Sequence, residues 1–184
     1  MARPRRPCHI EGMRAAVIAI LLVMATSVAA EPNARAPTTL AAHLRGRAHD
    51  RAIRAEVLAW HHTMRNGCVA YASTALRHVG VAIPERGMLD GDGVSRLTRG
   101  FVRYLEGELG WRRITDGAAL APGDLVFTTD VIPDYPAHVF VFLGWRARAR
   151  QVAVIADNTG YRKTRPLAAG GDRDGFAFAL RAPP

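Results

Sequence analysis

Cysteine is scarce in this 184-residue chain, and that scarcity excludes one class of fold. Only Cys8 and Cys68 are present, too few for the disulfide framework that stabilises many small exported domains. Lysine is scarcer still, because Lys163 is the single example and arginine supplies nearly all of the positive charge. Aromatic residues make up 7% of the chain and hydrophobic residues 49%. This composition is typical of an ordinary globular protein with one domain rather than of a disordered or collagen-like chain.

Long hydrophobic runs are also lacking. The longest uninterrupted one, residues 15–30, is shorter than the roughly 20 residues that a transmembrane helix needs, which argues against a membrane anchor. The run ends in small residues, with Val28 and Ala30 three residues and one residue before a cut that would precede Glu31. That pattern is typical of a secretory signal peptide. We therefore expect residues 1–30 to be removed on export, which places the mature protein in the periplasm or outside the cell.

Acidic residues are too few to balance the basic ones. The chain has 16 Asp and Glu against 25 Lys and Arg, a net charge of +9. Such a charge suits a polyanionic partner such as nucleic acid, anionic lipid or an acidic wall polymer, and does not choose among them. One basic cluster, Arg146, Arg148 and Arg150, could contact a polyanion but is more simply explained as an exposed charged turn. We expect a wall polymer or peptide as partner and no nucleic acid, and the sequence leaves the oligomeric state open.

Apolar periodicity divides the rest of the chain into helices followed by strands. We interpret residues 31–49 as a linker or N-terminal extension and residues 50–184 as one domain. Apolar residues at helical spacing predict helices over 50–64, 67–79 and 94–109, with a loop over 84–93. We interpret Asp50 as the N-cap of the first of these helices. Apolar runs bounded by turn residues predict strands over 125–127, 139–143, 152–155 and 176–180. Helices first and strands afterwards predict an α+β fold with an antiparallel sheet.

Cys68 is the only cysteine that remains after the expected cleavage. It follows Asn66, which we interpret as the N-cap of the second helix, so that Cys68 falls in the first helical turn. Unpaired backbone N–H groups and the helix dipole stabilise an anion there, which favours a thiolate. The simpler alternative is a buried structural thiol, because a lone cysteine in an amphipathic helix is most often a core residue.

His138 opens the most apolar strand, which is apolar on both faces and is therefore expected to be buried on both sides. Two polar residues, Asp157 and Asn158, close the next strand. If the two strands form a hairpin, His138 comes level with Asp157 or Asn158 at one end of the sheet. Pairing of residue 145 with residue 151 would put Asn158 opposite His138, whereas a carboxylate stabilises an imidazolium better than an amide does. We therefore predict Cys68 as nucleophile, His138 as base and Asp157 as the orienting residue, with Asn158 as the alternative.

A metal site is not indicated. His61 and His62 are adjacent, and adjacent residues on a helix point about 100° apart. No other histidine or cysteine stands at the spacing of metal ligands. We expect neither a metal nor an organic cofactor.

Five stretches carry a resemblance to a known group of enzymes: NGCVAYASTALRHVGV, LAPGDLVFTTD, AHVFVFLGW, VIADNTG and FAFALR. Together they are similar to the NlpC-type and CHAP-type cell-wall hydrolases of the papain-like superfamily, over roughly residues 50–182. The chain reads Asn-Gly-Cys-Val where NlpC-type enzymes usually have Asp-Cys-Ser. It reads Ala-Asp-Asn where CHAP-type enzymes tend to have Glu-x-Asn, so the subfamily stays open.

The resemblance implies a papain-like α+β fold, with the nucleophile at the N-terminus of a helix that packs on an antiparallel sheet. It implies that Cys68 is the nucleophile and His138 the base of a secreted cysteine peptidase or amidase. The expected substrate is an amide bond of peptidoglycan. Two alternatives are an inactive cell-wall or partner-binding module on the same fold, and a thiol acyltransferase that uses the same residues.

Overall fold

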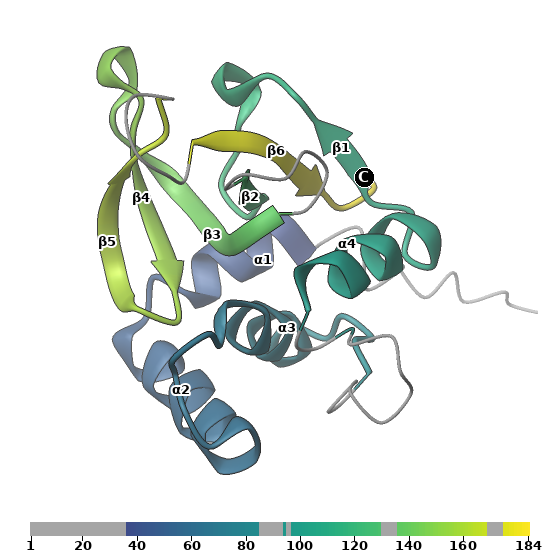
Figure 1. Ribbon diagram of the computed structural model, residues 1–184. Helices are drawn as coiled ribbons and strands as arrows, with labels where there is room; N and C mark the ends of the chain where they lie inside the picture. Colours follow the sequence, from purple (N-terminus) through teal and green to yellow (C-terminus); the bar gives the residue numbers. More distant parts are fainter. Residues whose placement is uncertain (1–35, 85–93, 95–96, 130–135, 169–174) are drawn as a thin grey trace, which may run out of the picture.

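Among the residues that the structure describes, six antiparallel strands form one sheet, three helices pack on it, and a fourth helix packs on one of these three (Figure 1). The computed structural model describes residues 36–84, 94, 97–129, 136–168 and 175–184. The expected signal peptide and nearly all of the expected loop over 84–93 lie outside the described residues. The helices are α1 (Ala36–His43), α2 (Arg47–His61), α3 (Cys68–His78) and α4 (Thr98–Gly107). Of these, α1, α3 and α4 contact the sheet, while α2 packs on α3. The strands are β1 (Arg112–Ile114), β2 (Leu125–Thr129), β3 (Pro136–Ala147), β4 (Val152–Asp157), β5 (Gly160–Pro166) and β6 (Phe176–Arg181).

The strand order is β1-β6-β2-β3-β4-β5, so β3 lies inside the sheet between β2 and β4. Its side chains alternate between two hydrophobic clusters. Val139 and Val141 face a cluster that includes residues from all four helices, whereas Phe140 and Phe142 face a second cluster on the opposite side of the sheet. All four side chains are fully buried. The expectation that this strand is buried on both faces is confirmed.

The predicted order of helices and strands is also confirmed, with small differences at the ends of the elements. Both unpredicted strands, β1 and β5, lie at the edges of the sheet. Their sequences, Arg-Arg-Ile and Gly-Tyr-Arg-Lys-Thr-Arg-Pro, contain few apolar residues. Edge strands are often charged in this way, so the apolar patterns that predict inner strands do not mark them.

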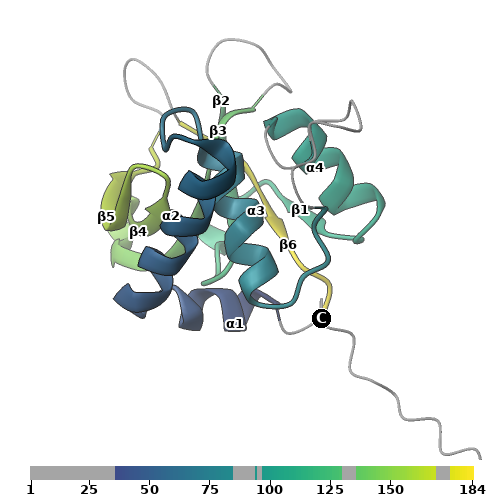
Figure 2. The same cartoon turned by 90° about the horizontal axis from the view of Figure 1, so that it is seen from below.

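The expected linker differs most from the structure. From residue 36 onward the chain is helical, first as α1 and then, after a short turn, as the start of α2. Leu40, Ala41 and Leu44 are buried in the main hydrophobic cluster. The segment therefore belongs to the folded domain, and Figure 2 shows α1 lying beside the ends of α2 and α3.

Candidate functional site

Cys68 is the first residue of α3, and its position is produced by a tight turn. Asn66 has the left-handed backbone conformation, with φ of 55°, and Gly67 rather than Asn66 is the N-cap. The expectation that Asn66 caps the helix is therefore wrong, because a left-handed residue one position earlier cannot supply the cap. The consequence expected for Cys68 still holds, because its backbone N–H lies in the first turn, where the helix offers no acceptor.

His138 lies near the start of β3, at the point where β2 and β3 lose their regular pairing. It pairs with Thr128, and the register shifts immediately afterwards. The imidazole is mostly buried, with 17% of the side chain exposed, and its Nε2 lies 3.1 Å from Oδ2 of Asp157. The imidazole also interacts with the thiol of Cys68, and this interaction raises the pKa of His138. Because Nε2 faces Asp157, Nδ1 is the nitrogen able to exchange a proton with the sulfur.

Asp157 ends β4 and is fully buried. One carboxylate oxygen, Oδ2, faces His138, and the other is held by the turn that follows. Oδ1 accepts hydrogen bonds from the backbone N–H of Thr159 at 2.7 Å, from the Thr159 hydroxyl at 2.7 Å and from the N–H of Gly160 at 3.0 Å. These are the bonds of an Asx turn, for which Asp-Asn-Thr-Gly is a recognisable sequence. The turn fixes the carboxylate in the orientation in which it meets the imidazole.

The pairing of β3 with β4 explains why Asp157 rather than Asn158 meets His138. The expected pairing of residue 145 with residue 151 is wrong, because Trp145 pairs with Ala153. One register shift lies on each side of Trp145, and Val141 pairs with Ala156. Continued toward the strand ends, this register puts Asp157 on the same face as His138. Bulges of this kind carry no clear signal in the sequence.

Asn158 points elsewhere. Its side-chain Nδ2 donates a 2.7 Å hydrogen bond to the backbone carbonyl of Met64, in the turn before α3. Its Oδ1 is buried without a hydrogen-bond partner among the described residues. Asn158 thus links the end of β4 to the turn that carries Cys68, and the structure does not bring its amide to His138.

The electrostatics of the three residues favour an ion pair. Burial raises the pKa of the Cys68 thiol, but the hydrogen bond and positive charge of His138, with the backbone N–H groups of Val139 and Val69, lower it below the ordinary value. Burial lowers the pKa of His138, but Asp157 and Cys68 outweigh it and raise this pKa to about 9. Burial raises the pKa of Asp157, but His138 and Thr159 bring it to about 2. The arrangement therefore favours a thiolate beside an imidazolium that a carboxylate stabilises.

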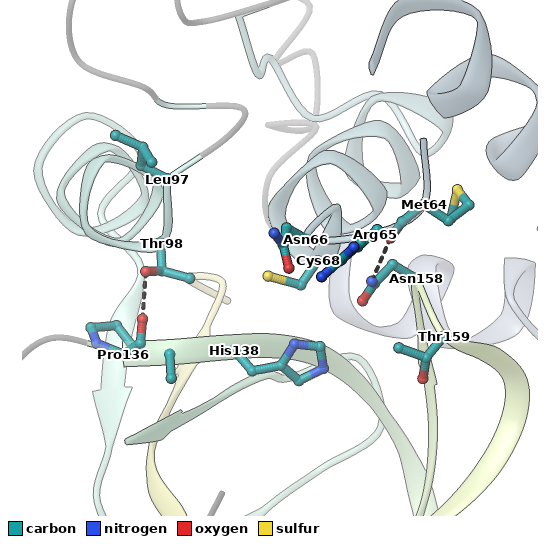
Figure 3. Close-up of a pocket in the computed structure, with 11 residues that line it drawn as sticks. Met64, Arg65, Asn66, Cys68, Leu97, Thr98, Pro136, His138, Asn158 and Thr159 are labelled. Atoms are coloured by element: carbon teal, nitrogen blue, oxygen red, sulfur yellow. Dashed lines mark hydrogen bonds between the residues drawn. The ribbon is translucent and has the colours of Figure 1, made fainter. Parts of the chain in front are cut away.

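An open cleft of about 710 Å³ gives access to the thiol. Figure 3 shows α4 on one side of it, β3 along its floor, and the turn before α3 opposite. Two apolar side chains, Met64 and Leu97, contribute to its walls, and Leu97 is half exposed. Its lining consists of Met64, Arg65, Asn66, Cys68, Leu97, Thr98, Pro136, Ala137, His138, Asn158 and Thr159. Cys68 and His138 thus lie where a bound molecule could reach them.

A buried polar network behind the site was not predicted. Asp50 was expected to cap α2, but it lies inside the helix with 3% exposure. Its carboxylate accepts hydrogen bonds from the Tyr71 hydroxyl at 2.7 Å and from Nε of Arg54 at 2.8 Å. The remaining guanidinium nitrogens of Arg54 reach the carbonyls of Asp157 and Asn158. The spacing of Asp50 and Arg54, four residues apart on a helix, is the only sequence signal of this network.

Neither a metal centre nor a membrane helix is found in the part of the chain that the structure describes. No three His, Cys, Asp or Glu side chains there are grouped so that they could hold a metal ion. No helix among the same residues is long and apolar enough to cross a membrane. Comparison with protein-family models, with curated proteins and with solved structures gave no match.

Proposed function

We propose that this protein is a thiol hydrolase that cleaves an amide bond, with peptidoglycan as its substrate. The observation that carries the proposal is the position of His138, which is hydrogen-bonded to Asp157 and lines the same open cleft as Cys68, with whose thiol it interacts electrostatically. Nucleophile, base and orienting group are the three parts that covalent catalysis by a thiol requires. A merely structural cysteine needs neither the histidine nor the carboxylate.

In the first step the Cys68 thiolate attacks the carbonyl carbon of the amide. A bond forms between Sγ and that carbon, and the electron pair of the C=O bond moves to oxygen. The backbone N–H of Cys68, at the start of α3, is the proposed donor to this oxyanion. The dipole of α3 adds to the stabilisation of negative charge at the same place.

In the second step the tetrahedral intermediate collapses. The C–N bond breaks, and the His138 imidazolium gives its proton to the leaving nitrogen, which departs as an amine. The acyl group stays on Cys68 as a thioester. Neutral His138 then takes a proton from water, and the resulting hydroxide attacks the thioester. The C–S bond breaks, the carboxylic acid is released, and the thiolate–imidazolium pair is restored. Throughout, Asp157 holds the ring and stabilises its positive charge.

The choice of peptidoglycan is supported by two independent sequence features. The pattern at residues 15–30 predicts export, and the Cys68, Pro122–Phe127 and His138 segments resemble NlpC-type and CHAP-type wall hydrolases. A papain-like fold is part of the same proposal. The observed order, a helix that begins at Cys68 followed by an antiparallel sheet with His138 near the start of an inner strand, supports it.

The test is digestion of purified peptidoglycan by the chain starting at Glu31, followed by mass analysis of the released muropeptides. We expect new fragments that have gained one water at an amide bond, and none from the Cys68→Ala variant. Binding of peptidoglycan without fragments from either protein would contradict hydrolysis and favour a binding module. Fragments whose acyl group is joined to an added amine instead of water would favour an acyltransferase.

A further inference from the structure

Arg54 lies behind the candidate site, and its side chain bridges two parts of the molecule that the chain keeps far apart. It extends from α2, and its guanidinium reaches the turn at the end of β4. Nη2 donates a 2.6 Å hydrogen bond to the carbonyl of Asp157, and Nη1 donates a 3.0 Å bond to the carbonyl of Asn158. The two bonds reach consecutive backbone carbonyls. The planar guanidinium of arginine has donors placed to bond two acceptors at once, whereas a lysine ammonium is a single point charge.

Arg54 is itself held in place. Its third bond runs from Nε to Oδ2 of Asp50 at 2.8 Å, one turn earlier on α2. Oδ1 of Asp50 accepts the hydroxyl proton of Tyr71, and the guanidinium lies 5.1 Å from the centre of the Tyr71 ring. Asp50 is 3% exposed, so its charge is balanced within the protein rather than by water. A buried, fully bonded network of this kind has one geometry.

The network joins the two halves of the site. Tyr71 lies one turn after Cys68 on α3, so the helix that carries the thiol is tied through Asp50 to Arg54. Arg54 in turn sets the position of the backbone from which the Asp157 carboxylate extends. The Asx turn orients that carboxylate only with respect to its own backbone. Its distance from the helix that carries the thiol is therefore set in part from α2, through Arg54, beside the direct bond from Asn158 to Met64.

We propose that Arg54 is a positioning residue of the reaction, which holds the Asp157 turn where its carboxylate meets Nε2 of His138. The inference rests on the proposed function, in which Cys68 is the nucleophile, but the effect of Arg54 on Cys68 can be measured without a substrate. If the turn moves, the imidazolium loses its carboxylate partner, and the thiolate that depends on the imidazolium becomes less stable. The reactivity of Cys68 therefore reports on Arg54.

The experiment is the pH dependence of Cys68 alkylation by iodoacetamide in the Arg54→Lys variant. Lysine keeps the charge that Asp50 needs but cannot bond both carbonyls. We expect the midpoint of alkylation to move upward by about one pH unit. At a pH well below both midpoints the rate should fall about threefold, once the greater nucleophilicity of a more basic thiolate is included. The matched control is Arg51→Lys, an exposed arginine on the same helix, whose midpoint should equal that of the wild type.

An unchanged midpoint in folded Arg54→Lys would overturn the inference and leave the proposed function standing. A wild-type midpoint at the value of an ordinary thiol would instead contradict the proposed function. If Arg54→Lys does not fold, the neutral double variant Asp50→Asn, Arg54→Gln takes its place, with the same expected upward movement. Failure of both to fold would also overturn the inference, because Arg54 would then act on stability rather than on the site.

Discussion

At the scale of single residues, the site depends on how one carboxylate divides its hydrogen bonds. Asp157 gives one oxygen to His138 and the other to Thr159 and Gly160, so its side chain cannot turn away from the imidazole. Asn158, the next residue, has its amide bonded to the carbonyl of Met64. Two adjacent polar residues that look equivalent in the sequence therefore have different tasks. Asp157 acts on the imidazole, and Asn158 braces the turn before α3.

The two variants Asp157→Asn and Asn158→Ala should separate these tasks. An amide in place of the carboxylate keeps the shape but cannot stabilise an imidazolium, so we expect hydrolysis to slow by about 10²-fold or more. Asn158→Ala removes one brace and should lower the free energy of unfolding by about 1 kcal/mol, with a much smaller effect on the rate. The measurements are the initial rate of muropeptide release and urea unfolding. A near-normal rate for Asp157→Asn with an inactive Asn158→Ala would reverse the assignment.

How far the sequence predicts single residues can be judged from the caps and the site. The types of residue that suit thiol chemistry, Cys68, His138 and Asp157, could be selected because each stands at the end of a recognisable element. The two predicted caps, Asp50 and Asn66, were wrong for a physical reason. Residues that cap helices also bond buried partners and adopt the left-handed conformation, and only the three-dimensional surroundings decide which of these occurs.

At the scale of elements, the segment Pro122–Phe127 is a structural device as well as a point of resemblance. The Asp124 carboxylate is fully buried and accepts two hydrogen bonds of 2.8 Å from Arg181, at the end of β6, as well as the N–H of Ala121. The N–H of Phe142 in β3 donates to the Asp124 carbonyl. This one residue thus joins the beginning of β2 to both of its neighbouring strands.

Replacing Asp124 should therefore weaken the sheet. Asp124→Ala leaves Arg181 without its carboxylate partner, and we expect the free energy of unfolding to fall by about 3 kcal/mol. Glu108→Ala, which removes an exposed acidic side chain, should change stability by less than about 0.5 kcal/mol. Urea unfolding followed by circular dichroism measures both. Equal free energies of unfolding for the two variants would show that the Asp124–Arg181 pair contributes nothing to stability.

Three histidines meet where α1, α2 and α3 come together. The rings of His43 and His49 stack at 3.9 Å, and the ring of His78 lies 5.8 Å from that of His43, with its Nε2 bonded to Glu56 at 2.7 Å. Burial, followed by the positive charges that His49 and His78 can carry, lowers the pKa of His43 below its ordinary 6.5. The unfolded chain therefore binds a proton at His43 more readily than the folded chain does.

The consequence is a loss of stability in mild acid. Because the unfolded state gains the proton first, the free energy of unfolding should fall as the pH drops below about 6.5. His43→Phe keeps a ring to stack on His49 but cannot be protonated, so its stability should fall less between pH 7 and pH 5. Thermal unfolding of both proteins across this range measures the difference. Parallel curves for the two proteins would contradict the prediction.

At the scale of the whole molecule, the succession of helices and then strands was enough to predict an α+β fold, because inner strands such as β3 are continuous apolar runs. The order of strands in the sheet was not predictable from these runs. It depends on β6 inserting between β1 and β2, a long-range pairing that no local pattern encodes. The edge strands β1 and β5 were missed because charged residues dominate them.

The boundary of the folded unit gives a prediction at the same scale. A chain starting at Asp50 lacks α1 with the buried side chain of Leu40, the following turn with the buried side chain of Leu44, and the first turn of α2. Removing a buried leucine typically costs about 2–5 kcal/mol, so we expect this chain to unfold at a much lower temperature than one starting at Glu31, or not to fold. Calorimetry measures the unfolding temperatures of the two chains. Equal temperatures would contradict the prediction and indicate that α1 is a linker that does not stabilise the domain.

The central claim, that Cys68 is an activated nucleophile paired with His138, is tested most directly by the rate of Cys68 alkylation with iodoacetamide at pH 6. The lowered pKa of Cys68 leaves more of it as thiolate at this pH than an ordinary thiol has, and this gain outweighs the lower nucleophilicity of a less basic thiolate. The account therefore predicts that the wild type reacts about tenfold faster than a folded His138→Ala variant. Equal, slow reaction of both folded proteins would contradict it and make Cys68 a structural thiol.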